Sequence, residues 1–310
     1  MKIGADQYNT FDTMTMDCWN DRVYYEGKEF PAGHFATEIL NFAGVIHDPL
    51  LERITVLTAL VDDLSTAEKS KRHDIASQLK PLLRNTVSWL YTCPPFCYCE
   101  EQRAYGALVH ALSEERLDRD YEEEEAHLPY LALSFCEPIL RILVAIYNFC
   151  LLIRAFEMKY LRGSKQRNAD AFAKAAHECF DEDDSFLILL EQMPFGGVEE
   201  FFSYPRVITG FKYFQDENDE EKWKTAQRVI CKRAIDFYVF DLMNGLHHGH
   251  APSQCQGCGR YFLTTNGYIP KYCDGVAPQD SRYTCRQYGA MMHQKEQNKQ
   301  HPVYRLFNTR

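Results

Sequence analysis

Residues 255–260 read Cys-Gln-Gly-Cys-Gly-Arg, and two further cysteines follow at positions 273 and 285. Zinc takes up to four thiolates at the corners of a tetrahedron, about 2.3 Å from the metal. Two cysteines separated by two residues on a tight turn can supply two of those corners, and glycines 257 and 259 permit the positive φ that such a turn needs. Four thiolates leave no open position, so the ion would be structural and not catalytic. We expect one zinc ion, with the ligands Cys255, Cys258, Cys273 and Cys285.

The residues between these cysteines predict a small β-hairpin followed by a helix. Residues 260–264 are typical of a strand, and Asn266-Gly267 is a strong hairpin-turn signal, so 268–272 is expected to return antiparallel. Residues 274–283 are expected to form a loop. Thr284 can cap a polar helix that begins at Cys285 and ends near Gln300. Together these elements predict a treble-clef-like module, which needs its metal because it has few large aliphatic side chains.

The charge of the chain divides near Leu246. The whole chain has 34 Lys and Arg against 44 Asp and Glu, a net charge of −10. From Leu246 onward there are eight basic and three acidic residues, so this part carries +5 and the rest carries −15. Basic side chains attract nucleic-acid phosphates, whereas an acidic surface repels them. The side chains that we expect to contact phosphate are Arg260, Lys271, Arg282, Arg286, Lys295 and Lys299.

The acidic part of the chain is expected to be mainly helical. Residues 22–30 predict a short β-hairpin with Glu26-Gly27 at the turn. Apolar residues recur at three- and four-residue spacing over 50–61 and again over 75–90, which predicts two amphipathic helices. Residues 131–160 are apolar on nearly every side and predict the central helix of the bundle. A last helix is expected around 223–238, with Asn244-Gly245 as its stop.

We therefore expect a mainly α protein with two domains. An acidic helical domain with a short N-terminal β-hairpin covers 1–246, a polar linker covers 247–254, and a basic four-cysteine zinc-binding domain with one β-hairpin and a helix covers 255–310. The linker is short and is broken by Gly and Pro. Its histidines, His247, His248 and His250, are expected to be hydrated, and replacement of a cysteine ligand by one of them is the alternative.

The remaining cysteines and the apolar runs predict a cytoplasmic protein that does not span a membrane. The most apolar run, 142–153, has 12 residues, whereas a span needs about 20. The N-terminus lacks an apolar secretory core, so the twelve cysteines are expected to be thiols and not disulfides. The expected small buried hydrophobic side chains are Cys136, Cys150, Cys179 and Cys231.

Two other groups of metal-binding residue types are interpreted as structural. Cys93, Cys97 and Cys99 lie in an aromatic turn, and no second ligand pair follows at a metal-site spacing. Acidic runs at 118–125, 181–184 and 216–221 are typical of solvated loops and helix starts.

No enzyme motif occurs in the chain: there is no P-loop, no dinucleotide-binding glycine pattern, no H-E-x-x-H and no G-x-S-x-G. Arg103 and His110, on an expected helix, resemble the Arg-x4–6-His pair of HEPN-type ribonucleases. That chemistry uses a polar residue directly after the arginine, and this chain has Ala104 there. We expect no catalytic residue, with a HEPN-like ribonuclease as an alternative.

The cysteine-rich segment resembles the zinc finger of the bacterial CGNR proteins. The resemblance rests on C-x2-C-G-R-Y-F, Y-C and T-C-R with Gly289 after them, and it covers about residues 255–290. It places the four cysteines on the finger's ligand positions, although Arg286-Gln287-Tyr288 stand where the family has Gly-Asn-Arg. CGNR proteins join a helical domain to such a finger and are regarded as transcriptional regulators. The layout of the whole chain is also similar to that of an uncharacterised bacterial family.

These features predict a non-enzymatic, zinc-stabilised nucleic-acid-binding or regulatory protein whose basic finger contacts DNA or RNA. The alternative is a protein-interaction module with purely structural zinc, whose basic finger docks on an acidic surface of its own chain, of a second copy or of another protein. Several aromatic side chains could stack on bases or form the small core of the finger, and for Phe262 we expect the core. These side chains are Tyr261, Phe262, Tyr268 and Tyr288.

Overall fold

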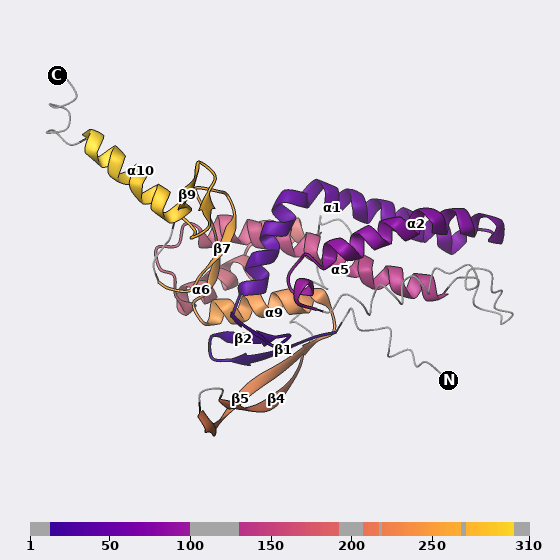
Figure 1. The fold of residues 1–310 in the computed structure, drawn as a ribbon, viewed down its shortest axis with the longest axis horizontal. Helices are drawn as coiled ribbons and strands as arrows, with labels where there is room; N and C mark the ends of the chain where they lie inside the picture. Colours follow the sequence, from indigo (N-terminus) through magenta and orange to yellow (C-terminus); the bar gives the residue numbers. More distant parts are fainter. Residues whose placement is uncertain (1–12, 100–129, 192–206, 217–218, 268–270, 301–310) are drawn as a thin grey trace.

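The computed structural model describes residues 13–99, 130–191, 207–216, 219–267 and 271–300 (Figure 1). It is a mixed α and β protein, so the expectation of a mainly α chain is only partly correct. A bundle of helices forms the centre, a five-stranded sheet lies below it in Figure 1, and a small cysteine-rich part projects at one end.

The sheet is antiparallel throughout and has the strand order β3-β2-β1-β5-β4. The predicted hairpin at 22–30 is confirmed, because β2 pairs with β3. Its turn residues, Glu26 and Gly27, have φ values of 46° and 73°, as two-residue hairpin turns require. The strands are β1 (Met14–Trp19), β2 (Arg22–Tyr25), β3 (Lys28–Pro31), β4 (Val207–Asp216) and β5 (Asp219–Cys231).

The expected helix at 223–238 is wrong over its first half. Residues up to Cys231 belong to β5, and helix α9 begins only at Ala234 and ends at His247. Strand β5 pairs with β1 and β4 along its two edges, and near its C-terminal end side chains on both of its faces are buried. Ala226 and Val229 are buried on opposite faces, and this three-residue spacing imitates one face of a helix. Trp223, at the far end of the same stripe, is 66% exposed.

The helices expected at 50–61 and 75–90 are confirmed within longer helices, and the central helix is confirmed as well. Helix α5 packs against both α1 and α9, and its Phe149 and Phe156 are buried. The four cysteines expected to be buried are buried. The helices are α1 (His34–Thr66), α2 (Lys69–Leu90), α5 (Tyr130–Phe156), α6 (Ala169–Phe180) and α7 (Asp184–Glu191), with short turns η3 (Phe96–Tyr98) and η4 (Glu157–Leu161).

One stretch of the central helices, Cys136–Leu161, is long and apolar enough to cross a membrane by length and composition. Its most apolar part is 67% buried inside the fold. Core helices that pack on other helices share these properties, so the stretch is weak evidence for a membrane span.

Helix α9 holds the start of α1 in place. The carboxylate of Asp241 accepts hydrogen bonds from the backbone N–H groups of Gly33 (3.0 Å) and Ala36 (2.9 Å). Burial raises the pKa of Asp241 to about 7, although these N–H groups oppose the shift. Gly245 does not end α9 as expected. It lies where the two helices touch, and a Cβ there would lie 2.8 Å from the Cα of Gly33.

The C-terminal part begins where a linker was expected. Residues 247–254 are the end of α9, a turn at His248-Gly249 and strand β6 (Ala251–Gln254). Strand β7 (Tyr261–Thr264) pairs with β6, and residues 268–270 of its expected partner 268–272 lie outside the described residues. The expected loop 274–283 contains a hairpin of β8 (Val276–Ala277) and β9 (Asp280–Thr284), and helix α10 (Cys285–Gln300) is as predicted.

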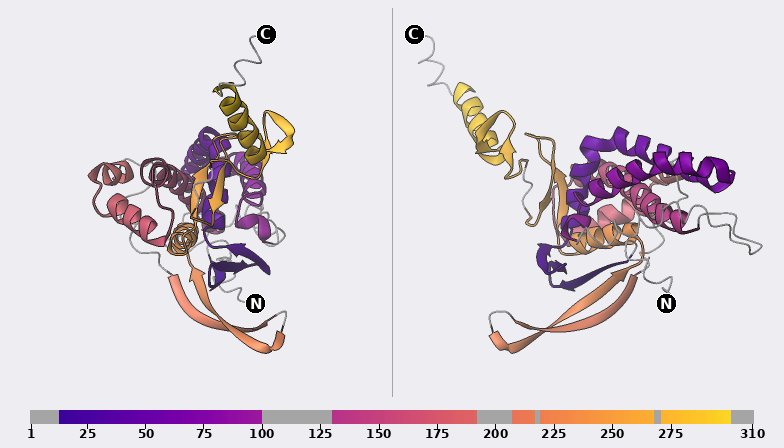
Figure 2. Two further views of the ribbon diagram at one scale, coloured as in Figure 1. Left: turned by 90° about the vertical axis from the view of Figure 1, so that its left-hand side faces the viewer. Right: turned by 45° about the vertical axis from the view of Figure 1, so that its right-hand side comes forward.

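The chain from Cys255 to Gln300 is called the cysteine module below, and the rest of the described chain is called the body. Figure 2 shows α10 pointing away from the body, while the β4–β5 hairpin curves out below the helices. Strands β6 and β7 rest on α1, and Ala251 and Tyr261 belong to the large core of the body. That the two parts are separate domains remains a prediction.

Candidate metal centre

The four predicted ligands come together in the structure. The Sγ atoms of Cys255, Cys258, Cys273 and Cys285 all lie within 4.8 Å of one another, and those of Cys258 and Cys273 are 3.6 Å apart. A tetrahedron of thiolates about 2.3 Å from a metal has edges of about 3.8 Å. The four cysteines can therefore hold one metal ion, and zinc is the metal that such a thiolate set suits best.

The first two cysteines lie in the turn of the β6–β7 hairpin. The N–H of Cys255 donates to the carbonyl of Arg260 (2.8 Å), and the N–H of Gly259 donates to the carbonyl of Cys255 (2.9 Å). Of the two glycines predicted to have a positive φ, only Gly259 has one, at 74°. Gly257 instead packs beside Cys285, where a Cβ would lie 3.4 Å from the sulfur.

The second two cysteines are joined by backbone hydrogen bonds at the start of α10. The N–H of Cys285 donates to the carbonyl of Gly275 (2.7 Å), and the N–H of Arg286 donates to the carbonyl of Cys273 (3.0 Å). The β8–β9 hairpin carries the chain away from Cys273 and back to Cys285. The long spacing between these two cysteines is therefore compatible with a single site.

The predicted cap of α10 is confirmed. The N–H of Gln287 donates to Oγ1 of Thr284 (3.2 Å), and the N–H of Thr284 donates to Oε1 of Gln287 (2.9 Å). This reciprocal pair is a capping box, which fixes the first turn of the helix. Cys285 is consequently held at a helix N-terminus, where the helix dipole favours a thiolate.

The thiols of the cluster differ in their pKa values. Burial opposes ionisation of Cys255, but backbone N–H groups of Cys273, Cys258 and Gly257 bring the pKa of this thiol down to about 7. Two of these bonds have N–S distances of 3.3 Å (Cys273) and 3.4 Å (Gly257). Burial and the neighbouring sulfurs raise the pKa of Cys273 to about 11 and raise that of Cys285 as well. A cation at the centre would favour the thiolate form of all four cysteines.

Aromatic side chains pack around the cysteines. Phe262, Tyr272 and Tyr288 are partly buried against the cluster, so the expected core role of Phe262 is confirmed. A Cβ at Gly289 would lie 2.5 Å from the ring of Tyr272, which shows how closely α10 packs on this ring. Tyr261 is buried in the core of the body and is not available for stacking, and Tyr268 lies outside the described residues.

The histidines of the former linker take no part in the cluster, which among the described residues consists of four cysteines. His250 is buried, and its Nδ1 lies 3.0 Å from the carbonyl oxygen of Ala32. The rings of His247 and His248 contact each other. The alternative in which a histidine replaces a cysteine ligand is therefore wrong.

The six predicted phosphate contacts are exposed but lie on several elements. Arg260 is in the β6–β7 hairpin turn, Lys271 precedes Tyr272, and Lys295 and Lys299 lie on α10. The other two already have carboxylate partners within the module, because Arg282 pairs with Asp280 (2.7 Å) and Arg286 pairs with Asp274 (3.0 Å). A phosphate would have to compete with these ion pairs.

The body and the module are joined by a contact that the sequence did not indicate. The side-chain amide of Asn41 on α1 binds both backbone groups of Tyr261: Oδ1 accepts from its N–H (2.7 Å), and Nδ2 donates to its carbonyl (2.9 Å). We call this pair of bonds the Asn41 clasp. Residues so far apart in sequence leave no local pattern, so only an alignment of relatives could have revealed the pair.

The other candidate groups do not form a second metal cluster among the described residues. Cys93 is buried, and burial raises its pKa to about 12, while Cys99 Sγ lies 3.2 Å from Tyr25 Oη. In the acidic run 181–184, Asp183 binds Lys159, Tyr160 and Ser185 at the start of α7. Arg103, His110 and the acidic run 118–125 lie outside the described residues.

The comparison with known proteins concerns the C-terminal third of the chain. Residues 203–310 match DUF6076, a family of unknown function. The matched segment takes in β4, β5 and α9 together with the cysteine module, so it begins well before the boundary expected near residue 246. Searches of curated proteins and of solved structures found no match. The resemblance to the CGNR finger therefore remains an interpretation of the cysteine spacing.

Proposed function

We propose that this chain is a zinc-stabilised nucleic-acid-binding or regulatory protein of the cytoplasm. In this proposal the four cysteines hold one structural zinc ion, and the module that the ion stabilises presents basic side chains to phosphates. The observation that carries the proposal is the position of α10, which begins at a cysteine of the cluster and projects from the body (Figure 2). Its Lys295 and Lys299 are exposed.

The charge of the module supports a polyanionic partner. Between Cys255 and Gln300 there are six basic and three acidic residues, a charge of +3 from these side chains, and four thiolates on one Zn²⁺ add −2, which leaves the module at +1. Phosphate contacts by such side chains supply most of the affinity of non-specific nucleic-acid binding, and they act without a sequence-specific surface. The acidic body would keep the rest of the chain away from the same polyanion.

Binding to duplex DNA, duplex RNA and single strands at about 50 mM and about 200 mM salt tests the proposal. The variant K295A/K299A removes two exposed lysines from α10, and K71A/K80A removes two exposed lysines from α2 as the matched control. We expect salt-sensitive binding whose log–log salt slope falls by about 2 in K295A/K299A, at roughly 0.9 for each lost phosphate contact. The control should keep the slope of the unmodified protein.

Absence of binding at the lower salt concentration, or an equal loss in K71A/K80A, would contradict the proposal. Degradation of the RNA would instead support the ribonuclease alternative, which rests on Arg103 and His110. Metal analysis of the reduced protein should give one zinc ion per chain. A protein without zinc would contradict the proposal that the ion stabilises the module.

A protein-interaction role is favoured by a different observation. The module exposes several apolar side chains, and exposed methionines are common at adaptable protein-binding surfaces. In that case the protein should not bind nucleic acid, and sedimentation should detect a salt-sensitive self-association or complex with an acidic protein. M291S/M292S should abolish this association. The exposed fractions are 40% for Met291, 43% for Met292, 65% for Val276 and 37% for Tyr283.

A further inference from the structure

A cleft of about 390 Å³ lies where η4, strand β6 and the first cysteines of the module meet. Clefts that bind small molecules have volumes from roughly 300 to 1,000 Å³, so this one has room for a small ligand. Its lining includes three cationic side chains, Arg162, Arg167 and Lys271, and one carboxylate, Glu157. None of these was singled out as a small-molecule site by the sequence.

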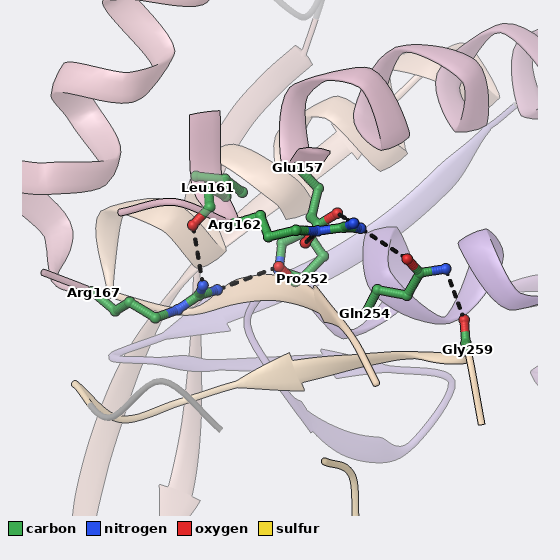
Figure 3. Close-up of polar contacts among 7 residues, drawn as sticks. All are labelled: Glu157, Leu161, Arg162, Arg167, Pro252, Gln254 and Gly259. Atoms are coloured by element: carbon green, nitrogen blue, oxygen red, sulfur yellow. Dashed lines mark hydrogen bonds and ion pairs between the residues drawn. The ribbon is translucent and has the colours of Figure 1, made fainter. Parts of the chain in front are cut away.

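Arg167 is the unusual member of this group. Only 3% of the residue is exposed, and burial lowers its pKa. Nη1 donates to the carbonyl of Leu161 (3.3 Å), and Nη2 donates to the carbonyl of Pro252 (3.4 Å), as Figure 3 shows. Nη2 also donates to the Thr264 hydroxyl (3.3 Å). These bonds are long and their acceptors are neutral, and Nε has no hydrogen-bond partner in the part of the chain that the structure describes.

Among the described residues, no carboxylate lies within ion-pair distance of Arg167. A guanidinium stays protonated in proteins, and a charge that is buried this deeply is normally paired. The charge of Glu157 acts on Arg167 and partly offsets the effect of burial on its pKa, but Glu157 makes no ion pair with it.

The neighbouring carboxylate is already engaged. Arg162 Nη2 lies 2.8 Å from Glu157 Oε2 and 2.8 Å from Gln254 Oε1, as Figure 3 shows. Gln254 in turn donates to the carbonyl of Gly259 in the hairpin turn of the module (3.1 Å). The charge of Glu157 is thus compensated by Arg162, which leaves the charges of Arg167 and of the exposed Lys271 at the cleft.

We propose that this cleft binds the phosphate group of a small phosphorylated molecule, with Arg167 as its buried contact and Lys271 as its exposed one. Arg162, Arg167 and Lys271 together outnumber the negative charges of Glu157 and of the Cys255 thiolate, which also lines the cleft. The cleft therefore keeps a net positive charge that attracts a phosphate monoester, which carries about −1.5 to −2 at neutral pH. Guanidinium groups also suit phosphate oxygens geometrically.

Because Gln254 connects the cleft to the hairpin turn that carries Cys255 and Cys258, a bound phosphate would contact the module directly. The proposal does not depend on nucleic-acid binding, since the cleft lies at the base of the module and the lysines tested above lie on α10.

Titration calorimetry and thermal melting of the full chain with inorganic phosphate and with phenyl phosphate test the proposal. Sodium chloride and sodium acetate at the same ionic strength serve as reference salts. We expect one phosphate bound per chain and a rise in Tm above that in either reference salt. K271A should weaken binding at least tenfold, because it removes one of two charges that are not compensated within the cleft.

R167K keeps a buried cation but loses the planar fork, and it should also weaken binding at least tenfold. K71A is the control, because it removes an exposed lysine of α2 outside the cleft, and it should bind phosphate as the unmodified protein does. Lys271 is exposed, so K271A should fold and can test the proposal even if R167K does not fold.

Three results would overturn the proposal. One is a Tm that responds to phosphate no more than to chloride, and another is equal affinity for acetate. The third is phosphate binding that K271A leaves unchanged or that K71A weakens as much as K271A does, which would show that the anion does not bind in the cleft.

Discussion

The body and the cysteine module are held together by different physical means. The core of the body buries large side chains completely, among them Phe35, Phe149, Phe237 and Tyr238. In the module, the buried cluster consists of three of the four cysteines and Ala277, with Cys258 and three aromatic rings only partly buried against it. Burial of apolar area stabilises the first, whereas the second has too little apolar area to fold by burial alone.

This difference predicts which change should destabilise each part. The body should respond to changes of volume in its core and remain indifferent to metal. The module should respond to loss of metal and remain indifferent to cavities in the body. The following experiments test that separation, beginning with the largest expected effect.

Removal of the metal should unfold the module and leave the body folded. A structural zinc ion contributes roughly 10–16 kcal/mol to the folding of small zinc modules, because the site exists only in the folded chain. We expect C273S, or a strong chelator, to abolish zinc binding and to remove the hydrogen-exchange protection of α10. Helices α1 and α5 should keep their protection.

C97S is the matched control, since Cys97 is an exposed cysteine outside the cluster. It should keep one zinc ion per chain. Loss of protection throughout the body on chelation would show that the two parts do not differ as described.

F237A should destabilise the body by about 3–5 kcal/mol, because it leaves a cavity in a close-packed core. Phe237 is completely buried and lies 5.2 Å from Phe35 and 5.5 Å from Tyr25, measured between ring centroids. Urea unfolding gives the free energy, and metal analysis should still give one zinc ion per chain. F211A, which truncates a phenylalanine that is 72% exposed on β4, should change the free energy little.

Replacement of one glycine in the body and one in the module by alanine should destabilise each part separately, by less than F237A destabilises the body. G245A pushes α9 away from the backbone of α1, and G289A pushes α10 against Tyr272, so each should cost roughly 1–3 kcal/mol in its own part. Hydrogen exchange should locate the first loss in α1 and α9 and the second in α10. G210A, where a Cβ meets nothing within 4 Å, is the control.

The smallest expected effect is the pH dependence of Asp17. Burial opposes its ionisation, but Arg228 and Lys212 bind its carboxylate at 2.7–3.0 Å and hold its pKa below the ordinary 3.8. A carboxyl whose pKa is lower in the folded state adds stability above the unfolded pKa, and this contribution is lost as the pH falls through the folded value. D17N should therefore cost roughly 1–2 kcal/mol at pH 7 and less at pH 3.

Urea unfolding of D17N and of the unmodified protein at both pH values gives this difference. D280N removes a carboxylate that pairs with the exposed Arg282 in the module, and it should have no measurable effect because solvent screens that pair. A difference for D17N that is equal at pH 7 and pH 3 would contradict the assignment.

The four-cysteine cluster was predictable because the spacing of its residues in the sequence is local. Four cysteines in a short segment have few other uses in a protein without disulfides, and the capped helix at Cys285 follows from Thr284 and Gln287. The helices of the body were predictable for the same reason, since their apolar spacing repeats over several turns.

The strands were predicted less well because their pairing is not local. In β5 the buried residues do not alternate, since side chains on both faces of the strand are buried near its C-terminal end. In the module, β7 pairs with β6 across the cysteine turn, a pairing that no local pattern marks, and the return strand expected after Asn266-Gly267 lies largely outside the described residues. The charge cluster at Arg167 joins residues from distant elements, and no sequence pattern marks it.

The Asn41 clasp gives the module a fixed orientation. Strand β7 belongs to both parts, because Tyr261 is buried in the body while the next residue, Phe262, packs against the cysteines. A module on a loose tether would sample many directions, and its partner would have to select one of them. Here α10 extends from the body in one direction. If two copies were to bind side by side, the dimensions of the folded body, and not the length of a flexible linker, would therefore determine the distance between their α10 helices.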